Sequence, residues 1–315
     1  MKNTLIFFIL AYIPLAVNAT PFSWPQLTPK QIGSKTYVIE HGPHDENKKL
    51  SRGFHNNPGF VITRDGVVVI DTGSSVEIGK MILRKIEKLT DKPVTHIFNT
   101  HFHGDHWLAN QALLEKYPSA RTIAHPKLIA LLKAGQDKFW IDVFTKRLGD
   151  DFKGTKAVIP AEAAASRDYK IGGMTFTVKL FDQAHTATDL MVFVKEDAVL
   201  FTGDIVNNEH FSFMGHGNFK GAYEATQWAL AQKPKYVVVG HGRSGTQDLI
   251  PAFADIYKTL RDTVIKYYDQ GLQDYEIKPK LIAALSKYKH WSGFESQVGR
   301  YASLLVAEVE AEQFQ

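Results

Sequence analysis

Four potential metal ligands stand within six residues of the sequence: His101, His103, Asp105 and His106. Imidazole nitrogen and carboxylate oxygen are common ligands of Zn, Mn and Fe in proteins. The apolar segment 94–99 comes directly before them and predicts a buried strand. Gly104 and the surrounding polar residues predict a tight loop at the end of this strand. A single histidine is usually structural, but this grouping favours a metal site.

Three later segments repeat the arrangement of an apolar strand followed by a residue that can bind metal. They are His185 after 174–181, Asp204 after 198–201, and His241 after 236–239. Glycine stands beside Asp204 and His241, where it allows two backbones to approach a shared centre closely. Each of these residues alone would be interpreted as structural. Because the placement recurs, convergence of the four strand ends on one metal site is the better interpretation.

The rest of the chain predicts the elements that must position these side chains. Apolar runs separated by short turns predict two hairpins, 59–63 with 66–70 and 190–194 with 198–201. Apolar residues at helical spacing predict helices over 75–89, 107–117 and 127–144. Further short strands are expected at 35–40, 121–124 and 157–160.

Other polar residues near the strand ends are assigned supporting or surface roles. Asp71 follows the first hairpin, and we expect it to brace a neighbouring loop rather than to bind metal. A polar segment over 41–59 contains His41, His44 and His55. These histidines lack strand-end placement and close grouping, so they are not assigned as ligands. The segment is interpreted as a surface connection, with a flap over a pocket as the alternative.

Composition bounds the class of protein. The chain has 315 residues and 44% hydrophobic content, enough for a sizeable core in one large or two modest domains. The net charge is +4 without a long basic run, so no nucleic-acid partner is expected. The expected partner is a small-molecule substrate. The sequence contains no cysteine, which excludes disulfides, thiolate ligands and cysteine nucleophiles. The oligomeric state is left open.

The N-terminus is typical of a secretory signal peptide. Lys2 precedes an apolar run over 5–13, and small residues at 17 and 19 flank a position that fits cleavage after Ala19. The apolar run is short for a membrane-spanning helix, so no stable membrane insertion is expected after cleavage. An uncleaved anchor is the alternative. An exported chain without cysteine suits the bacterial periplasm, so a periplasmic or secreted location is expected.

The C-terminal part changes in character. Phe253, Tyr257 and Leu260 begin a helical pattern that Gly271 ends, and two shorter amphipathic runs follow. We expect a structural cover that packs on the core and supplies no metal ligand. The predicted organisation is a signal peptide at 1–19, a catalytic domain at 20–248 and a helical appendix at 249–315.

The metal-ligand motif over 101–106, followed in order by His185, Asp204 and His241, resembles the metallo-β-lactamase superfamily over residues 35–245. The resemblance implies an α/β fold with a four-layer αββα sandwich and a metal site at one edge. It also implies two metal sites joined by Asp204 as a bridging carboxylate. The implied first site is His101, His103 and His185, and the implied second site is Asp105, His106 and His241.

A dinuclear metal-dependent hydrolase is the function that this resemblance implies. Two Zn²⁺ ions are the expected cofactors, and a ligand set of nitrogen and oxygen also accepts Mn or Fe. A hydroxide held between the two cations would attack an ester, thioester, lactone or amide carbonyl. Asp105 and Asp204 are the expected catalytic residues, because they can orient the hydroxide and pass a proton to the leaving group.

Position 204 narrows the branch of the superfamily. Secreted β-lactamases of the superfamily typically carry Cys or Ser where this chain has Asp204, so the sequence is more similar to glyoxalase II and lactonase-like hydrolases. Weak or absent β-lactam turnover is therefore expected, with β-lactamase activity as an alternative. A second alternative resembles sulfur dioxygenases, with one iron held by His101, His185 and Asp204. A metal or ligand carrier is the third alternative and fits a full bridging set least well.

Overall fold

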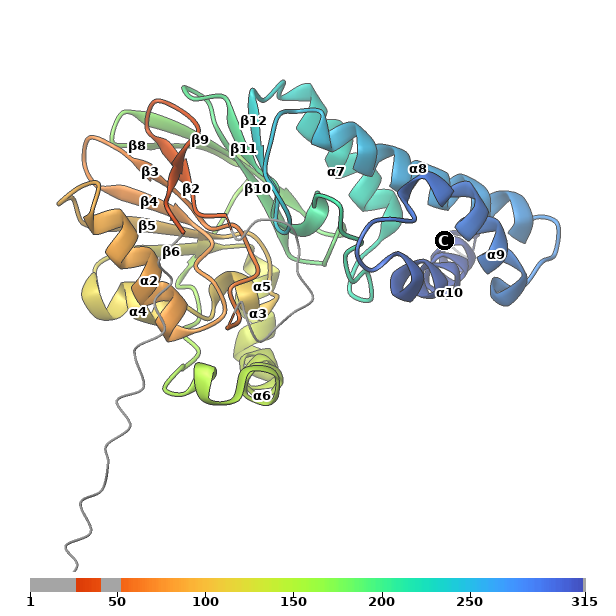
Figure 1. Ribbon diagram of the computed structural model, residues 1–315, viewed down its shortest axis with the longest axis horizontal. Helices are drawn as coiled ribbons and strands as arrows, with labels where there is room; N and C mark the ends of the chain where they lie inside the picture. The colour runs from red at the N-terminus through yellow and green to blue at the C-terminus, as the bar shows by residue number, and fades with distance from the viewer. Residues whose placement is uncertain (1–26, 41–51, 314–315) are drawn as a thin grey trace, which may run out of the picture.

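The computed structural model describes residues 27–40 and 52–313. Two β-sheets pack face to face, and helices cover their outer faces (Figure 1). The predicted α/β class and four-layer αββα sandwich are therefore confirmed. The expected signal peptide at 1–19, its cleavage after Ala19, and both His41 and His44 lie outside the described residues.

The first sheet has the strand order β1-β2-β3-β4-β5-β6-β7. Its pairs are antiparallel from β1 to β4 and parallel from β4 to β7. Pairing of β3 with β4 confirms the first predicted hairpin. The strands are β1 (Lys30–Gln31), β2 (Thr36–Val38), β3 (Gly59–Ile62), β4 (Val67–Ile70), β5 (Val94–Asn99), β6 (Arg121–Ala124) and β7 (Glu162–Ala163).

The second sheet has the order β12-β11-β10-β9-β8. Strand β11 pairs with β12 in parallel and with β10 in antiparallel fashion, and the latter pair is the second predicted hairpin. Strand β8 was not predicted, because its residues are mostly polar and exposed. The strands are β8 (Arg167–Ile171), β9 (Met174–Phe181), β10 (Asp189–Val194), β11 (Val199–Phe201) and β12 (Tyr236–Val238).

Strand β4 packs against the layer on each side of its own sheet. Successive side chains of a strand point to opposite faces of the sheet. Val67 and Val69 pack outward against α2 (Val76–Glu87) and α4 (Asn110–Lys116), whereas Val68 and Ile70 pack between the sheets. An uninterrupted apolar strand is therefore buried on both faces, as expected for a strand in the parallel part of a sheet.

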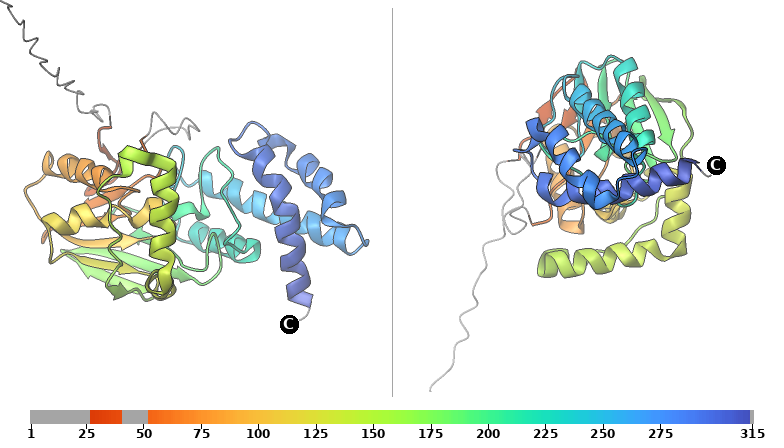
Figure 2. Two further views of the ribbon diagram at one scale, coloured as in Figure 1. Left: turned by 90° about the horizontal axis from the view of Figure 1, so that it is seen from below. Right: turned by 90° about the vertical axis from the view of Figure 1, so that its right-hand side faces the viewer.

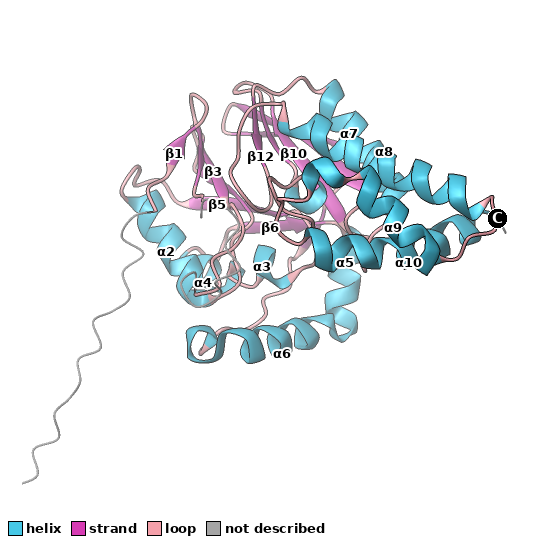
Figure 3. Cartoon of the chain, turned by 45° about the vertical axis from the view of Figure 1, so that its right-hand side comes forward, coloured by secondary structure: helices cyan, strands magenta, loops and turns pink. Residues whose placement is uncertain are grey.

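The outer face of the second sheet is covered by helices from the later part of the chain. Apolar residues of β10, β11 and β12 pack with α7 (Phe219–Ala231) and α8 (Leu249–Tyr268). Helices α9 (Asp274–Ala284) and α10 (Phe294–Gln313) complete this group, which extends to one side of the sandwich (Figures 1 and 3). None of the helices within the described residues is both long and apolar enough to cross a membrane.

Two predicted helices are divided in the structure. The helix expected over 107–117 is preceded by a separate short helix, α3 (Gly104–Trp107), so half of the expected metal loop is helical. The helix expected over 127–144 consists of α5 (Pro126–Leu131), a π-helical turn at Leu132–Gln136, and α6 (Asp137–Leu148). Gly135, inside the π-helical turn, has a φ angle of +108°, which redirects the chain so that α6 projects from the body (Figure 2).

One predicted strand is wrong, and one helix was missed. Residues 157–160 are not a strand, and β7 begins only after Pro160, which has no N–H group for a ladder hydrogen bond. Helix α7 was not predicted from the sequence. Asn218 begins this helix by accepting a hydrogen bond from the backbone nitrogen of Gly221.

Candidate metal centre

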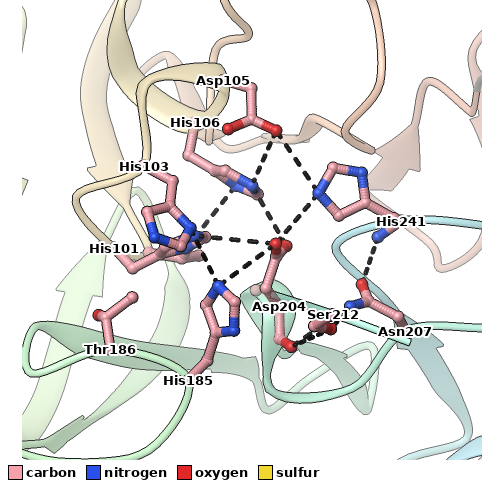
Figure 4. A network of polar contacts seen from close by, with 12 residues as sticks. His101, His103, Asp105, His106, His185, Thr186, Asp204, Asn207, Ser212 and His241 are labelled. Carbon is pink, nitrogen blue, oxygen red and sulfur yellow. Dashed lines mark hydrogen bonds and ion pairs between the residues drawn. The ribbon is translucent and has the colours of Figure 1, made fainter. Parts of the chain in front are cut away.

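All of the predicted metal ligands lie together at one edge of the sandwich, where strands of both sheets end (Figure 4). They form two groups in which the potential ligand atoms lie within 4.8 Å of one another. One group is His101, His103, His185 and Asp204, and the other is Asp105, His106 and His241. The strand-end placement seen in the sequence therefore produces the predicted convergence, although it spans two separate sheets.

In the first group, three imidazoles and one carboxylate oxygen face a common centre. Nδ1 of His103 lies 3.0 Å from Nε2 of His185, which in turn lies 3.5 Å from Oδ2 of Asp204. Nε2 of His101 lies 3.9 Å from the same oxygen. That nitrogen is buried and has no hydrogen-bond partner among the described residues. A buried polar atom without a partner is costly, and a bound cation would satisfy it.

In the second group, two imidazoles face two carboxylates. Oδ2 of Asp105 lies 3.7 Å from Nε2 of His106 and 3.5 Å from Nε2 of His241. Asp204 also reaches this group, because Oδ1 lies 3.2 Å from Nε2 of His106 and Oδ2 lies 3.0 Å from Nε2 of His241. Asp204 thus contacts both donor groups, as a bridging ligand must. The residues present fit a pair of cations bound by nitrogen and oxygen.

Glycine is required beside Asp204 by close approach of two loops. Asp204 lies in a 3-10 turn at Gly203–Ile205, and Gly203 adopts a φ angle of +52°. A Cβ atom on Gly240 would lie only 1.9 Å from Oδ1 of Asp204, so no larger residue fits there without displacing the carboxylate. The backbone nitrogen of Gly240 donates a hydrogen bond of 3.0 Å to the carbonyl oxygen of Gly203. This bond joins the loops that follow β11 and β12.

Asp71 supports two of the histidines through the ring nitrogens that face away from the donor groups, as expected for a supporting residue. Its Oδ2 atom accepts hydrogen bonds from Nδ1 of His106 and from the hydroxyl of Thr100, each at 2.8 Å. The same hydroxyl oxygen lies 3.1 Å from Nδ1 of His101 and can accept a hydrogen bond from it. Protons placed on these outer nitrogens leave lone pairs on the inner nitrogens, where a cation would bind.

The electrostatic environment shifts the pKa values of the histidines in opposite directions in the two groups. Burial lowers the pKa of His101 and of His103, and it lowers the pKa of His185 to about 4. Burial also acts on His106 and His241, but nearby carboxylates, chiefly Asp204, outweigh it and raise the pKa of both. The three histidines of the first group are therefore neutral near pH 7, whereas cation binding at the second group would displace protons from His106 and His241.

A cavity of about 510 Å³ opens beside both donor groups. Its wall contains the aromatic side chains of Trp140, Phe144, Phe211 and Phe213. Asp105 and Asp204 are the only carboxylates among the described residues that line it, and Arg147 is the only lysine or arginine. The site therefore combines a polar floor with an aromatic wall, which suits a substrate that carries an apolar group.

Several cavity residues were missed by sequence reasoning. His55, left as a surface residue, lines the cavity, and its carbonyl oxygen lies 3.0 Å from Nδ1 of His241. The segment 249–315 was interpreted only as a cover, yet Gly293, Ser296 and Gln297 line the cavity. It contributes no residue to either donor group. No local pattern marks these residues, because contacts across long sequence distances place them there.

The sequence model that describes the "Metallo-beta-lactamase superfamily" matches residues 52–241. The chain belongs to this superfamily. Metallo-beta-lactamase IND-1 from Chryseobacterium indologenes is 25% identical over 228 residues, which are 69% of this chain and 80% of that protein. Linear primary-alkylsulfatase from Pseudomonas sp. (strain ATCC 19151) is 43% identical over 42 residues. This match spans 13% of the chain but only 8% of the alkylsulfatase.

Solved structures of two kinds share the fold. A metallo-beta-lactamase from Pontibacter korlensis has a TM-score of 0.59 at 21% identity, over 74% of this chain and 99% of that one. The sec-alkylsulfatase Pisa1 from Pseudomonas sp. has a TM-score of 0.63 at 14% identity, over 80% of this chain and 45% of that one. Membership of the superfamily confirms the predicted class of metal-dependent hydrolase. The predicted leaning toward lactonase-like branches stays a prediction.

Proposed function

We propose that this protein hydrolyses an ester, thioester, lactone or amide bond at a centre of two Zn²⁺ ions. The contact of Asp204 with both donor groups carries the proposal, because a bridging carboxylate is needed only where two cations lie side by side. When bound, the cations would polarise the scissile carbonyl and lower the pKa of a shared water toward about 7. Mn or Fe would suit the same donors.

The two carboxylates differ in a way that suggests separate roles. The Asp204 side chain is 7% exposed, lies among four histidines and has a pKa far below its ordinary value, because His241 and His106 outweigh the effect of burial. It would hold and orient the attacking water. The Asp105 side chain is 15% exposed and lines the cavity, so it would carry the proton to the leaving group.

The cavity wall supports a substrate with an aryl or alkyl group. Trp140 and Phe213 both lie near His103, with ring centroids 5.2 and 6.4 Å from that imidazole. An apolar group against these rings would be removed from water and held beside the donor groups.

For the expected export, we propose cleavage after Ala19 and a periplasmic or secreted location. Mass spectrometry of a periplasmic extract would test this proposal.

Elemental analysis combined with a hydrolysis panel tests the proposed function. We expect two zinc equivalents per chain and turnover of an aryl ester, a lactone or a thioester. A cephalosporin should be at least about tenfold slower in kcat/KM, a barrier difference of about 1.4 kcal/mol. A single iron without hydrolysis would instead favour the dioxygenase alternative. A folded, zinc-loaded chain without any turnover would favour a metal carrier.

Hydrolysis of sulfate esters is the second candidate. Two alkylsulfatases are among the similar proteins, and Pisa1 covers a larger share of this chain than the Pontibacter β-lactamase does. Arg147 on the cavity wall could contact the anionic sulfate. An alkyl sulfate and the carboxylate ester of the same alcohol should be compared on one metal-loaded sample. Faster turnover of the sulfate would replace the carbonyl ester as the preferred substrate class.

A further inference from the structure

A histidine outside both donor groups contacts His103 from behind. Nδ1 of His103 faces His185 in the first donor group, and Nε2 of His103 lies 3.1 Å from Nδ1 of His216. His216 belongs to the loop that precedes α7 and is not part of either cluster of potential ligands. The contact therefore links a candidate ligand to a loop that the metal-ligand motif does not include.

Packing and hydrogen bonds hold His216 against the site. Its ring centroid lies 5.2 Å from that of Phe102 and 5.1 Å from that of Phe213. Asn218, two residues later, donates a backbone hydrogen bond of 2.8 Å to the carbonyl oxygen of Ala184. That carbonyl directly precedes His185, so the loop is anchored next to a second candidate ligand. The position of His216 is therefore set by the same backbone that positions the site.

The two ring nitrogens of His103 must have opposite roles if this residue binds a cation. A neutral imidazole has one N–H donor and one lone pair. A cation at Nδ1 requires the proton to be on Nε2, and Nε2 must then donate to an acceptor. Nδ1 of His216 provides that acceptor. The arrangement parallels the support of His106 by Asp71 and of His241 by a backbone carbonyl.

We propose that His216 is a positioning residue that directs the Nδ1 lone pair of His103 into the first donor group and so strengthens cation binding there. This inference rests on the proposed dinuclear centre. The outer partners of metal-binding histidines typically contribute about 10- to 100-fold to metal affinity. Loss of the acceptor at position 216 should therefore weaken the binding of one cation and leave the binding of the other unchanged. The reason is that His216 contacts only His103 among the seven candidate ligands in the described part of the chain.

Two substitutions distinguish the effect of losing the hydrogen-bond acceptor from the effect of changing the side chain. His216→Leu removes the acceptor and keeps an apolar group between the two phenylalanine rings. His216→Asn retains an oxygen close to the position of Nδ1 and should restore the hydrogen bond. His290→Leu is the matched control, because His290 is an exposed histidine outside the site. Thermal unfolding of the metal-free variants checks that each one folds.

Zinc titration of the full chain in competition with a chromophoric chelator tests the proposal. For His216→Leu we expect one of two zinc ions to bind about 10- to 100-fold more weakly, and hydrolysis lost at limiting zinc should return at saturating zinc. His216→Asn should stay within about threefold of the wild type, and the control should not change. Wild-type zinc affinity in a folded His216→Leu variant, or equal losses of affinity in the Leu and Asn variants, would overturn the role of His216 but not the proposed centre. A wild-type chain that binds no zinc would overturn the proposed centre together with this role.

Discussion

Oδ2 of Asp71 lies 2.8 Å from Nδ1 of His106, and this contact connects the end of β4 with α3. Asp71 adopts a φ angle of +58°, a left-handed conformation that asparagine also tolerates. The substitution Asp71→Asn should therefore keep the backbone but remove the charge that holds the proton of His106. We expect zinc affinity at the second donor group to fall by about 10- to 100-fold. Zinc titration measures the loss, and exposed Asp91→Asn is the control.

Removing the carboxylate of Asp204, the proposed bridge between two cations, should abolish hydrolysis without unfolding the protein. Asp204 and His103 lie after strand ends at the rim of the sandwich, so Asp204→Ala and His103→Ala should not open the core between the sheets. Far-ultraviolet circular dichroism and turnover are measured on the same samples. Wild-type turnover in a folded, metal-analysed Asp204→Ala variant would contradict the dinuclear mechanism.

Asp197 should make a pH-dependent contribution to stability. Its carboxylate accepts hydrogen bonds from Ser34, Lys35 and Thr36, joining the β1–β2 turn to the β10–β11 turn. Burial acts to raise the pKa of Asp197, but these hydrogen bonds outweigh it and lower the pKa. Because the folded pKa is depressed, the stabilisation is present above the unfolded pKa of about 4 and is lost as the pH falls through the folded value.

The variant Asp197→Ala should consequently be about 1.5 kcal/mol less stable than the wild type at pH 7. The difference should shrink as the pH is lowered below about 4. Urea unfolding at a series of pH values measures both quantities. A difference that stays constant down to about pH 3 would show that the contribution does not depend on the charge of Asp197.

Glu308 should be important for the stability of the C-terminal helices. Its carboxylate accepts hydrogen bonds of 2.7 and 3.0 Å from the backbone nitrogens of Phe219 and Lys220, and it pairs with Arg261. Glu308 therefore joins α10 to the N-terminus of α7 and to α8. Its side chain is 8% exposed. Glu308→Ala would leave the two backbone N–H groups without their acceptor and Arg261 with Glu312 as its remaining carboxylate partner, at a cost of about 2 kcal/mol. Exposed Glu310→Ala should change the free energy of unfolding by less than about 0.5 kcal/mol.

The convergence of these side chains was predictable because each one follows an apolar strand or lies in one dense motif. His185 and Asp204 stand after β9 and β11, and a shared sheet edge brings such residues together. The helical character of Asp105 and His106 was not predictable, because α3 has four residues and shows no periodicity. Strand 157–160 was predicted from apolar character alone, although Pro160 argued against it.

The surroundings of the donor groups were much less accessible to prediction. His216 is exposed and Gln297 is partly buried, and neither belongs to a recognisable sequence motif. Only the folded chain places His216 beside His103 and Gln297 on the cavity wall. Their positions depend on α7 and α10, which pack through long-range contacts. Local sequence patterns report which face of an element is apolar, but they do not report which distant element covers it.

The cavity wall and the donor groups come from different stretches of the chain, and this separation bears on how the activity could diversify. Every candidate ligand precedes residue 242, whereas Ser296 and Gln297 belong to α10. Substitutions on that face of α10 can alter which molecules fit without touching a donor atom. The reaction chemistry can thus be kept while this face of α10 changes, so substrate preference in related chains should depend on α10 and the aromatic wall residues rather than on the ligand motif.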